Sequence, residues 1–95
     1  MHARVLHEAR VEAERLLEAV RSALAADAAL LAASEREMIE RQIVALAAVA
    51  SGNDHRAIRQ ASEALNRATE EFAGRRMDAG VKRALAGRKI ANLDL

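Results

Sequence analysis

Histidines and carboxylates are the side chains of this sequence that could ligate a metal ion or transfer a proton. The three histidines, His2, His7 and His55, form no H-x-x-x-H pair with an acidic partner. The carboxylates alternate with arginines at three- or four-residue spacing, as Glu37 does with Arg41, which is typical of a solvated, salt-bridged helix face. The sequence has no cysteine and no glycine-rich phosphate loop. We therefore predict no catalytic, cofactor-binding or metal site in this chain.

The basic end of the chain is the feature that could bind nucleic acid. Residues 75–95 carry six lysines and arginines against two aspartates, whereas the whole chain has a net charge of +1. The single aromatic residue, Phe72, offers little base stacking, and cations near a helix C-terminus also favour the helix dipole. The longest nearly apolar run, residues 23–33, contains Asp27 and is too short to cross a bilayer. We predict neither a nucleic-acid partner nor a membrane partner.

The elements that must position any functional surface are helices. Alanine, leucine, arginine and glutamate dominate the composition, which includes 1% aromatic residues and no proline. Those residues favour helices, whereas strands favour the β-branched and aromatic residues that are scarce here. The 95 residues suffice for one small domain. We predict an all-α fold, an antiparallel bundle of three main helices with a short fourth helix at its C-terminal end.

The first helix is predicted over residues 3–31 and is the longest of the predicted helices. At 1.5 Å per residue it would span about 40 Å. No Ser, Thr, Asp or Asn stands before it to cap its first amides, so we expect the chain to be a fragment of a longer one. Its apolar residues recur at three- and four-residue steps and line one face: Leu6, Ala9, Ala13, Leu16, Leu17, Val20, Leu24 and Leu31.

Two shorter helices are predicted over residues 35–50 and 54–74. Ser34 and Glu37 fit a capping box at the start of the first, and Asn53 or Asp54 can cap the second. Each helix carries one apolar stripe, and spacings of three and four residues suit packing between antiparallel neighbours. The predicted buried residues are Ile39, Ile43, Leu46, Ala47 and Ala50 in the first, and Ile58, Ala61, Leu65, Ala68 and Phe72 in the second.

A change of phase after Gly74 predicts a bend in the chain. At 100° per residue, the apolar residues that follow lie about 140–220° away from Phe72 round the helix axis. One straight helix would bury one stripe and expose the other, so we favour a break near Gly74 and a short helix over 77–86, capped by Asp78. Residues 88–95 are predicted to fray. The second stripe is a candidate surface for a different partner and consists of Met77, Val81 and Leu85.

The length of the first helix predicts an exposed interface. The two shorter helices would be about 25–30 Å long and could not cover a helix of about 40 Å. The N-terminal part of the first apolar stripe should therefore project beyond the bundle, and an uncovered apolar strip marks an interface. We expect this strip to pack on a neighbouring domain of a longer chain, and on a second copy, as a homodimer, when the chain is isolated. It consists of Val5, Leu6, Ala9, Ala13 and Leu16.

Two parts of the sequence resemble sequences of one known family. Residues 8–18, EARVEAERLLE, run on to residues 23–31, ALAADAALL, and residues 72–78, FAGRRMD, continue through residues 81–85, VKRAL. Both pairs are similar to the C-terminal helical lid of the DnaK-type, seventy-kilodalton heat-shock chaperones. Within that family they look most like the HscA branch, which serves iron–sulfur cluster assembly in bacteria. The turn at 51–54 takes the place of the lysine-glycine-glutamate-aspartate turn of general DnaK lids.

This resemblance implies a lid of the substrate-binding domain, which gates the release of client peptide and has no turnover of its own. The ATPase domain, with its bound ATP, and the peptide-gripping β-sandwich subdomain would precede this segment, so no ATP site is carried over to its residues. The resemblance further implies the iron–sulfur scaffold IscU as client and the J-domain protein HscB as co-chaperone, in a bacterial cytoplasm. Two alternatives are a free-standing helical adaptor or dimerisation module and a small regulatory nucleic-acid binder.

Overall fold

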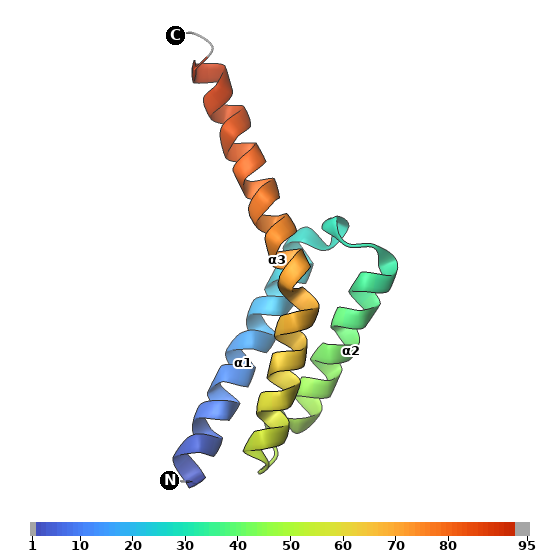
Figure 1. The fold of residues 1–95 in the computed structure, drawn as a ribbon, viewed down its shortest axis with the longest axis vertical. Helices are drawn as coiled ribbons and strands as arrows, with labels where there is room; N and C mark the ends of the chain where they lie inside the picture. The colour runs from blue at the N-terminus through green and yellow to red at the C-terminus, as the bar shows by residue number, and fades with distance from the viewer. Residues whose placement is uncertain (1, 93–95) are drawn as a thin grey trace.

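The computed structural model describes residues 2–92, and within this range the chain folds into helices joined by short turns (Figure 1). Helix α1 spans His2–Asp27 and is followed by a single 3-10 turn, η1, at Ala28–Leu30. Helix α2 spans Ala33–Ala50, and α3 spans His55–Asn92. Helices α1 and α3 run in the same direction, and α2 runs back beside them (Figure 1). The predicted all-α, antiparallel bundle with three main helices is confirmed.

The start of α3 is fixed by Asp54, one of the two capping residues that the sequence offers. The Asp54 carboxylate accepts hydrogen bonds from the backbone amides of Arg56 and Ala57, at 3.0 and 3.2 Å. These amides belong to the first turn of the helix, where no carbonyl of the preceding turn can reach them. A short turn at 51–54 therefore suffices to reverse the chain between α2 and α3.

The start of α2 differs from the prediction. Ser34 does not cap this helix, because the helix already begins at Ala33 and Ser34 lies inside its first turn. The capping carboxylate is that of Glu35, which accepts a hydrogen bond from the Ala32 amide at 2.9 Å, and Glu37 takes no part in this contact. The observed cap lies two residues before the predicted one, because η1 ends at Leu30 and α2 already begins at Ala33.

The core of the bundle is formed by one apolar stripe from each helix. The stripes occupy the predicted positions, since three- and four-residue spacing keeps these side chains on one face of each helix. Ala47 is an exception and is exposed, and Ala50, Ala61 and Ala68 are only partly buried at the edge of the core. The buried residues are Ala9, Ala13, Leu17, Val20, Ala23, Ile39, Ile43, Leu46, Ile58, Leu65 and Phe72.

The predicted break near Gly74 is wrong. Helix α3 continues without interruption for 38 residues, so there is no separate helix over 77–86, and Asp78 lies inside α3 instead of capping a new one. A glycine inside a helix costs only about 1 kcal/mol relative to alanine, and no proline removes a hydrogen bond here. Residues 88–92 are helical where fraying was predicted. The last part of that predicted tail, residues 93–95, lies outside the described residues.

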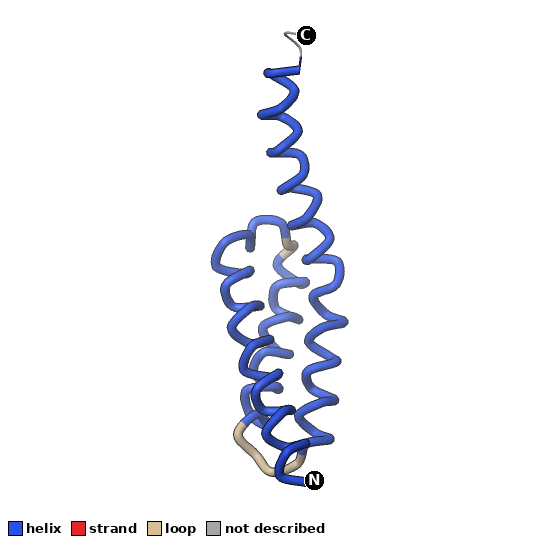
Figure 2. The backbone as a smooth tube through the Cα atoms, turned by 90° about the vertical axis from the view of Figure 1, so that its left-hand side faces the viewer, coloured by secondary structure: helices blue, strands red, loops and turns tan. Residues whose placement is uncertain are grey.

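The part of the molecule that overhangs is the end of α3, not the start of α1. Among the α3 residues up to 87, Phe72 is the last with a buried side chain, and beyond Arg76 the helix leaves the bundle and stands alone (Figures 1 and 2). At 1.5 Å per residue α3 is about 57 Å long, close to the 60 Å length of the whole molecule. The predicted overhang of α1 is therefore wrong: α1 ends at Asp27 instead of residue 31, and it is covered from Ala9 onward.

Candidate functional site

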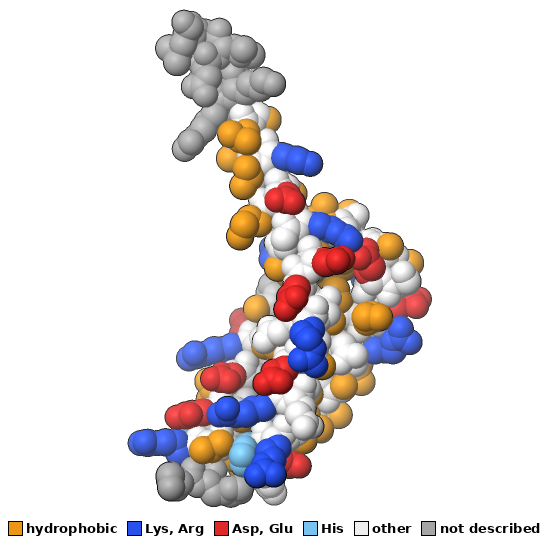
Figure 3. Space-filling model, in the orientation of Figure 1, with side chains coloured by type: hydrophobic (Ala, Val, Ile, Leu, Met, Phe, Trp, Pro, Cys, Tyr) orange, Lys and Arg blue, Asp and Glu red, His pale blue; other side chains and the backbone are white. Residues whose placement is uncertain are grey.

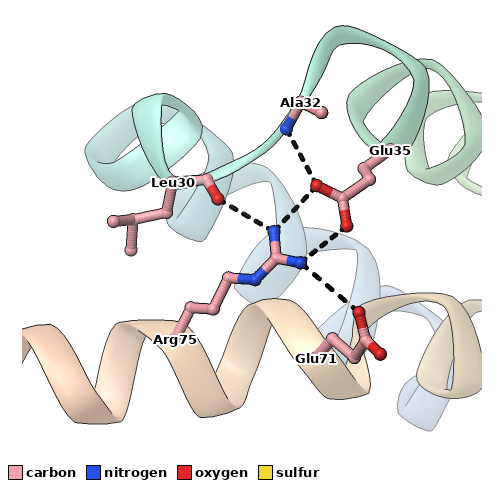
Figure 4. A network of polar contacts seen from close by, with 5 residues as sticks. All are labelled: Leu30, Ala32, Glu35, Glu71 and Arg75. Atoms are coloured by element: carbon pink, nitrogen blue, oxygen red, sulfur yellow. Dashed lines mark hydrogen bonds and ion pairs between the residues drawn. The ribbon is translucent and has the colours of Figure 1, made fainter.

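The point where α3 leaves the bundle is held by Arg75 (Figure 4). Its guanidinium donates paired hydrogen bonds to the two oxygens of Glu35, at 2.7 and 2.8 Å, and another to the carbonyl of Leu30, at 3.0 Å. A longer bond of 3.4 Å reaches Glu71 within α3 itself. The side chain thus joins α3 to η1 and to the first turn of α2, and a planar guanidinium suits this two-pronged geometry.

The same contacts fix the charge of Glu35. The hydrogen bonds from Arg75 and, secondarily, from the Ala32 amide lower the pKa of the Glu35 carboxyl from 4.5 to about 2. A carboxylate with so low a pKa is a weak base, and it is ionised throughout the neutral range. This carboxyl is therefore suited to holding the bundle together and poorly suited to transferring protons.

Arg76 makes a second link at the same level. Its guanidinium donates a hydrogen bond of 2.8 Å to the Asp27 carboxylate at the end of α1, and its carbon lies 5.9 Å from the centre of the Phe72 ring. Consecutive arginines therefore reach opposite neighbours, Arg75 toward α2 and Arg76 toward α1. In the sequence both belong to a basic stretch, because their acidic partners Glu35 and Asp27 lie 40 and 49 residues away along the chain.

Arg10 makes a comparable set of hydrogen bonds at the other end of the bundle. Its side chain donates hydrogen bonds to the carbonyl of Gly52, at 2.7 and 3.0 Å, and to the side-chain oxygen of Asn53, at 2.8 Å. A longer bond of 3.4 Å reaches the Ser51 carbonyl. The carbonyl acceptors lie in the turn after α2, where no helical amide is available to bind them. The sequence offers no signal for this contact, since Arg10 looks like any other arginine at the border of a helical stripe.

The candidate interface on α1 is part of the core. Ala9 and Ala13 are 1% and 0% exposed, and Leu6 and Leu16 are partly buried against the same core. Val5 is also half-buried. The prediction that this strip is free to receive a partner is therefore wrong, because α2 and α3 together cover it.

The second candidate surface is exposed, as its phase requires. Met77, Val81 and Leu85 are 72%, 50% and 56% exposed and lie four residues apart along the free end of α3. Figure 3 shows hydrophobic side chains gathered along one side of this part of the molecule. We call these three residues the extension stripe. The bundle leaves this predicted apolar surface uncovered.

The titratable side chains of the described residues are spread over the bundle surface and its helix ends. Within residues 2–92, no group of three or more histidine, cysteine, aspartate or glutamate side chains could hold a metal ion. His7 is exposed on α1, and His55 is half-buried at the start of α3. Among the described residues, no helical stretch combines the length and the hydropathy that crossing a bilayer requires.

Comparison with known proteins identifies close relatives of this segment. A chaperone protein HscA homolog of Ralstonia pickettii is 54% identical over 93 residues, which is 98% of this chain and 15% of that protein. The homolog of Burkholderia orbicola is 56% identical over 90 residues, 95% of this chain and 14% of the relative. A third, from Cupriavidus pinatubonensis, is 52% identical over 93 residues, again covering 98% and 15%.

These matches confirm the resemblance to the HscA chaperones that the sequence predicts. The chain spans about 15% of the length of these relatives, so it corresponds to one segment of them. No model of a protein family matches the chain.

Proposed function

Because this chain matches one segment of the HscA chaperones over nearly its whole length, we propose that it is the lid of a substrate-binding domain that slows the release of bound client. The observation that carries the proposal is a helical bundle whose helices are tied together at both ends, combined with identity of more than half to HscA homologues. A gate of this kind needs a stiff body, and the bundle supplies one.

The stiffness has identifiable sources. The core stripes of the three helices pack on one another, and α3 is joined to α1 through Arg76 and to α2 through Arg75. At the opposite end Arg10 of α1 holds the turn between α2 and α3. A force applied to α1 is therefore passed to the whole bundle, so that a hinge outside it would move the lid as one piece.

The proposed lid has no chemistry of its own. We assign no cofactor or catalytic residue to this segment, and ATP binding belongs to another domain of the longer chaperone. The proposed partners are the β-sandwich subdomain that grips the peptide, the scaffold IscU as client and the co-chaperone HscB. The proposed location is the bacterial cytoplasm, where iron–sulfur clusters would be assembled with this chaperone.

The test uses the Ralstonia pickettii homolog in three forms: the complete protein, the protein without its matching 93 residues, and a chimera with this chain in their place. The measurement is the dissociation rate of a fluorescein-labelled IscU peptide in the presence of ADP. We expect release to be several-fold faster without the segment and to return to the slow rate in the chimera, whereas binding itself persists. Equal dissociation rates in all three forms would refute the gating function.

A matched pair of substitutions asks whether the stiffness of the bundle matters. Leu65→Ala in the chimera loosens the core, and Leu85→Ala makes the same change on an exposed site of the same helix. We expect faster release with Leu65→Ala and no change with Leu85→Ala. The opposite pattern would show that the lid acts through the surface of α3 and not through its packed body.

A further inference from the structure

The extension stripe is an apolar surface without a cover in this chain. Its residues follow one another at four-residue steps on residues 77–92, the part of α3 beyond the links of Arg75 and Arg76, which we call the extension. At 100° per residue they occupy an arc of about 80° on the helix surface. Their combined exposure distinguishes them from single exposed apolar residues, which are common and need no partner.

The two flanks of the stripe differ in character. On one flank lie Asp78 and Lys82, both exposed and four residues apart. The ion pairs between described side chains include neither of them. On the other flank lie small residues, among them Gly80 and Ala84, and the space beside Gly80 is open. A second helix could therefore approach closely on one side and meet a pair of opposite charges on the other.

We propose that the extension stripe binds a second copy of this chain, with the two α3 extensions antiparallel about a two-fold axis at Val81. In this arrangement Val81 packs against Val81 of the second copy. Met77 of each copy packs against Leu85 of the other. The contact is self-complementary, as a two-fold interface requires. This association goes beyond the proposed lid function and does not depend on it.

Charge complementarity favours the second copy in this orientation. With the axis at Val81, Asp78 lies level with position 84 of the second copy and so within one turn of its Lys82, and the symmetry repeats this pair. A parallel, in-register pair would instead place Asp78 against Asp78 and Lys82 against Lys82. Like charges directly opposite each other are destabilising, so the charges select the antiparallel pair.

The length of the extension also fits this arrangement. Eleven residues follow Val81 in α3, a distance of about 16 Å. The end of one helix therefore arrives level with Glu70 of the second copy, which is exposed on the outer face of α3. The two bundles lie at opposite ends of the dimer and do not compete for the same space. A contact between two short helices buries less than the roughly 1,200 Å² of standard interfaces, so the association is weak.

Sedimentation of the 95-residue chain tests the association, over concentrations from about 20 µM to 1 mM because weak interfaces dissociate in this range. We expect the average mass to rise from 10.3 kDa toward twice that value. Val81→Lys should abolish the rise, because it sets two cations against each other on the axis. Val44→Lys changes an exposed valine of α2, 68% exposed, and should leave the rise intact. A monomer at every concentration, or equal effects of the two substitutions, would overturn the proposal.

Charge reversal and cross-linking test the orientation. Asp78→Lys and Lys82→Asp should each weaken the dimer at least several-fold, and the double variant should restore it, since the reciprocal pairs are re-formed with opposite signs. The chain has no cysteine, so single cysteines report distances cleanly. Under oxidation Val81→Cys should form a disulfide dimer, whereas Met77→Cys should do so only when mixed with Leu85→Cys. Efficient cross-linking of Met77→Cys alone would show a parallel pair and refute the antiparallel one.

Discussion

The core and the extension of α3 should respond very differently to the same substitution. Leu65 and Leu85 stand on one helix, 20 residues apart, but Leu65 is 0% exposed and Leu85 is 56% exposed. Removing a fully buried leucine side chain costs about 2–5 kcal/mol, since transfer energy is lost and a cavity remains between the three helices. At Leu85 the removed carbon atoms are mostly in water already, so we expect a change within about 0.5 kcal/mol.

The size of this difference relative to the total stability makes it measurable. A domain of 95 residues has a free energy of unfolding of about 5–14 kcal/mol. A loss of about 3 kcal/mol would lower the melting temperature of such a domain by about 12–24 °C, whereas 0.5 kcal/mol would lower it by only about 2–4 °C. Leu65→Ala should thus remove a large share of the stability, and Leu85→Ala should remain close to the unmodified chain.

The assay is thermal unfolding followed by the helical circular dichroism signal, at low micromolar concentration so that self-association through the extension does not contribute. Both variants keep the same helix propensity, because alanine replaces leucine in each. Equal shifts at the two positions would refute the reasoning, since they would mean that the extension is packed as tightly as the core or that Leu65 is not buried.

Three further predictions concern backbone and charge. Gly74→Ala should stabilise the chain by about 0.5–1 kcal/mol, because the glycine is helical and an added Cβ meets nothing within 4 Å; a destabilised variant in denaturant melts would indicate a bend at this residue. Asp54→Ala should cost about 1 kcal/mol in the same melts through loss of the α3 cap, and Asp54→Asn should cost less. The Glu35 pKa of about 2 lies below its unfolded value, so its contribution is complete above about pH 4.5 and is lost as the pH falls toward 2. Unfolding free energies measured between pH 7 and pH 2 should therefore fall further in the unmodified chain than in Glu35→Gln, and parallel curves would contradict the assignment.

The two ends of the bundle show how the same residue type is used for different contacts. Arg75 and Arg76 bind carboxylates of neighbouring helices, whereas Arg10 binds carbonyl oxygens of a turn. In each case the guanidinium reaches an acceptor that lies 40 or more residues away along the chain. An arginine-rich, tyrosine-free sequence can therefore build specific tertiary links without aromatic anchors, because the planar fork of the guanidinium fixes direction as well as charge.

The apolar stripes of the core could be predicted because each depends on spacing within one helix. Ile39, Ile43 and Leu46, for example, occupy one face whatever the helix packs against. The exposure of the α1 strip could not be predicted, because it depends on how far the neighbouring helices extend. The first half of α3 extends along α1, and this buries Ala9 and Ala13.

The sequence by itself determined the helical class, the stripes, a cap at residue 53 or 54 and the relationship to the HscA chaperones, since these follow from local periodicity, local hydrogen bonds and residue identity. The tertiary structure decided where α3 leaves the bundle and which apolar stripe stays exposed. At Gly74 a local penalty of about 1 kcal/mol competes with the helical hydrogen bonds of α3 and with the links from Arg75 and Arg76 to distant acids. Those acids become neighbours only in the folded chain, and for that reason the continuous helix is a property of the fold.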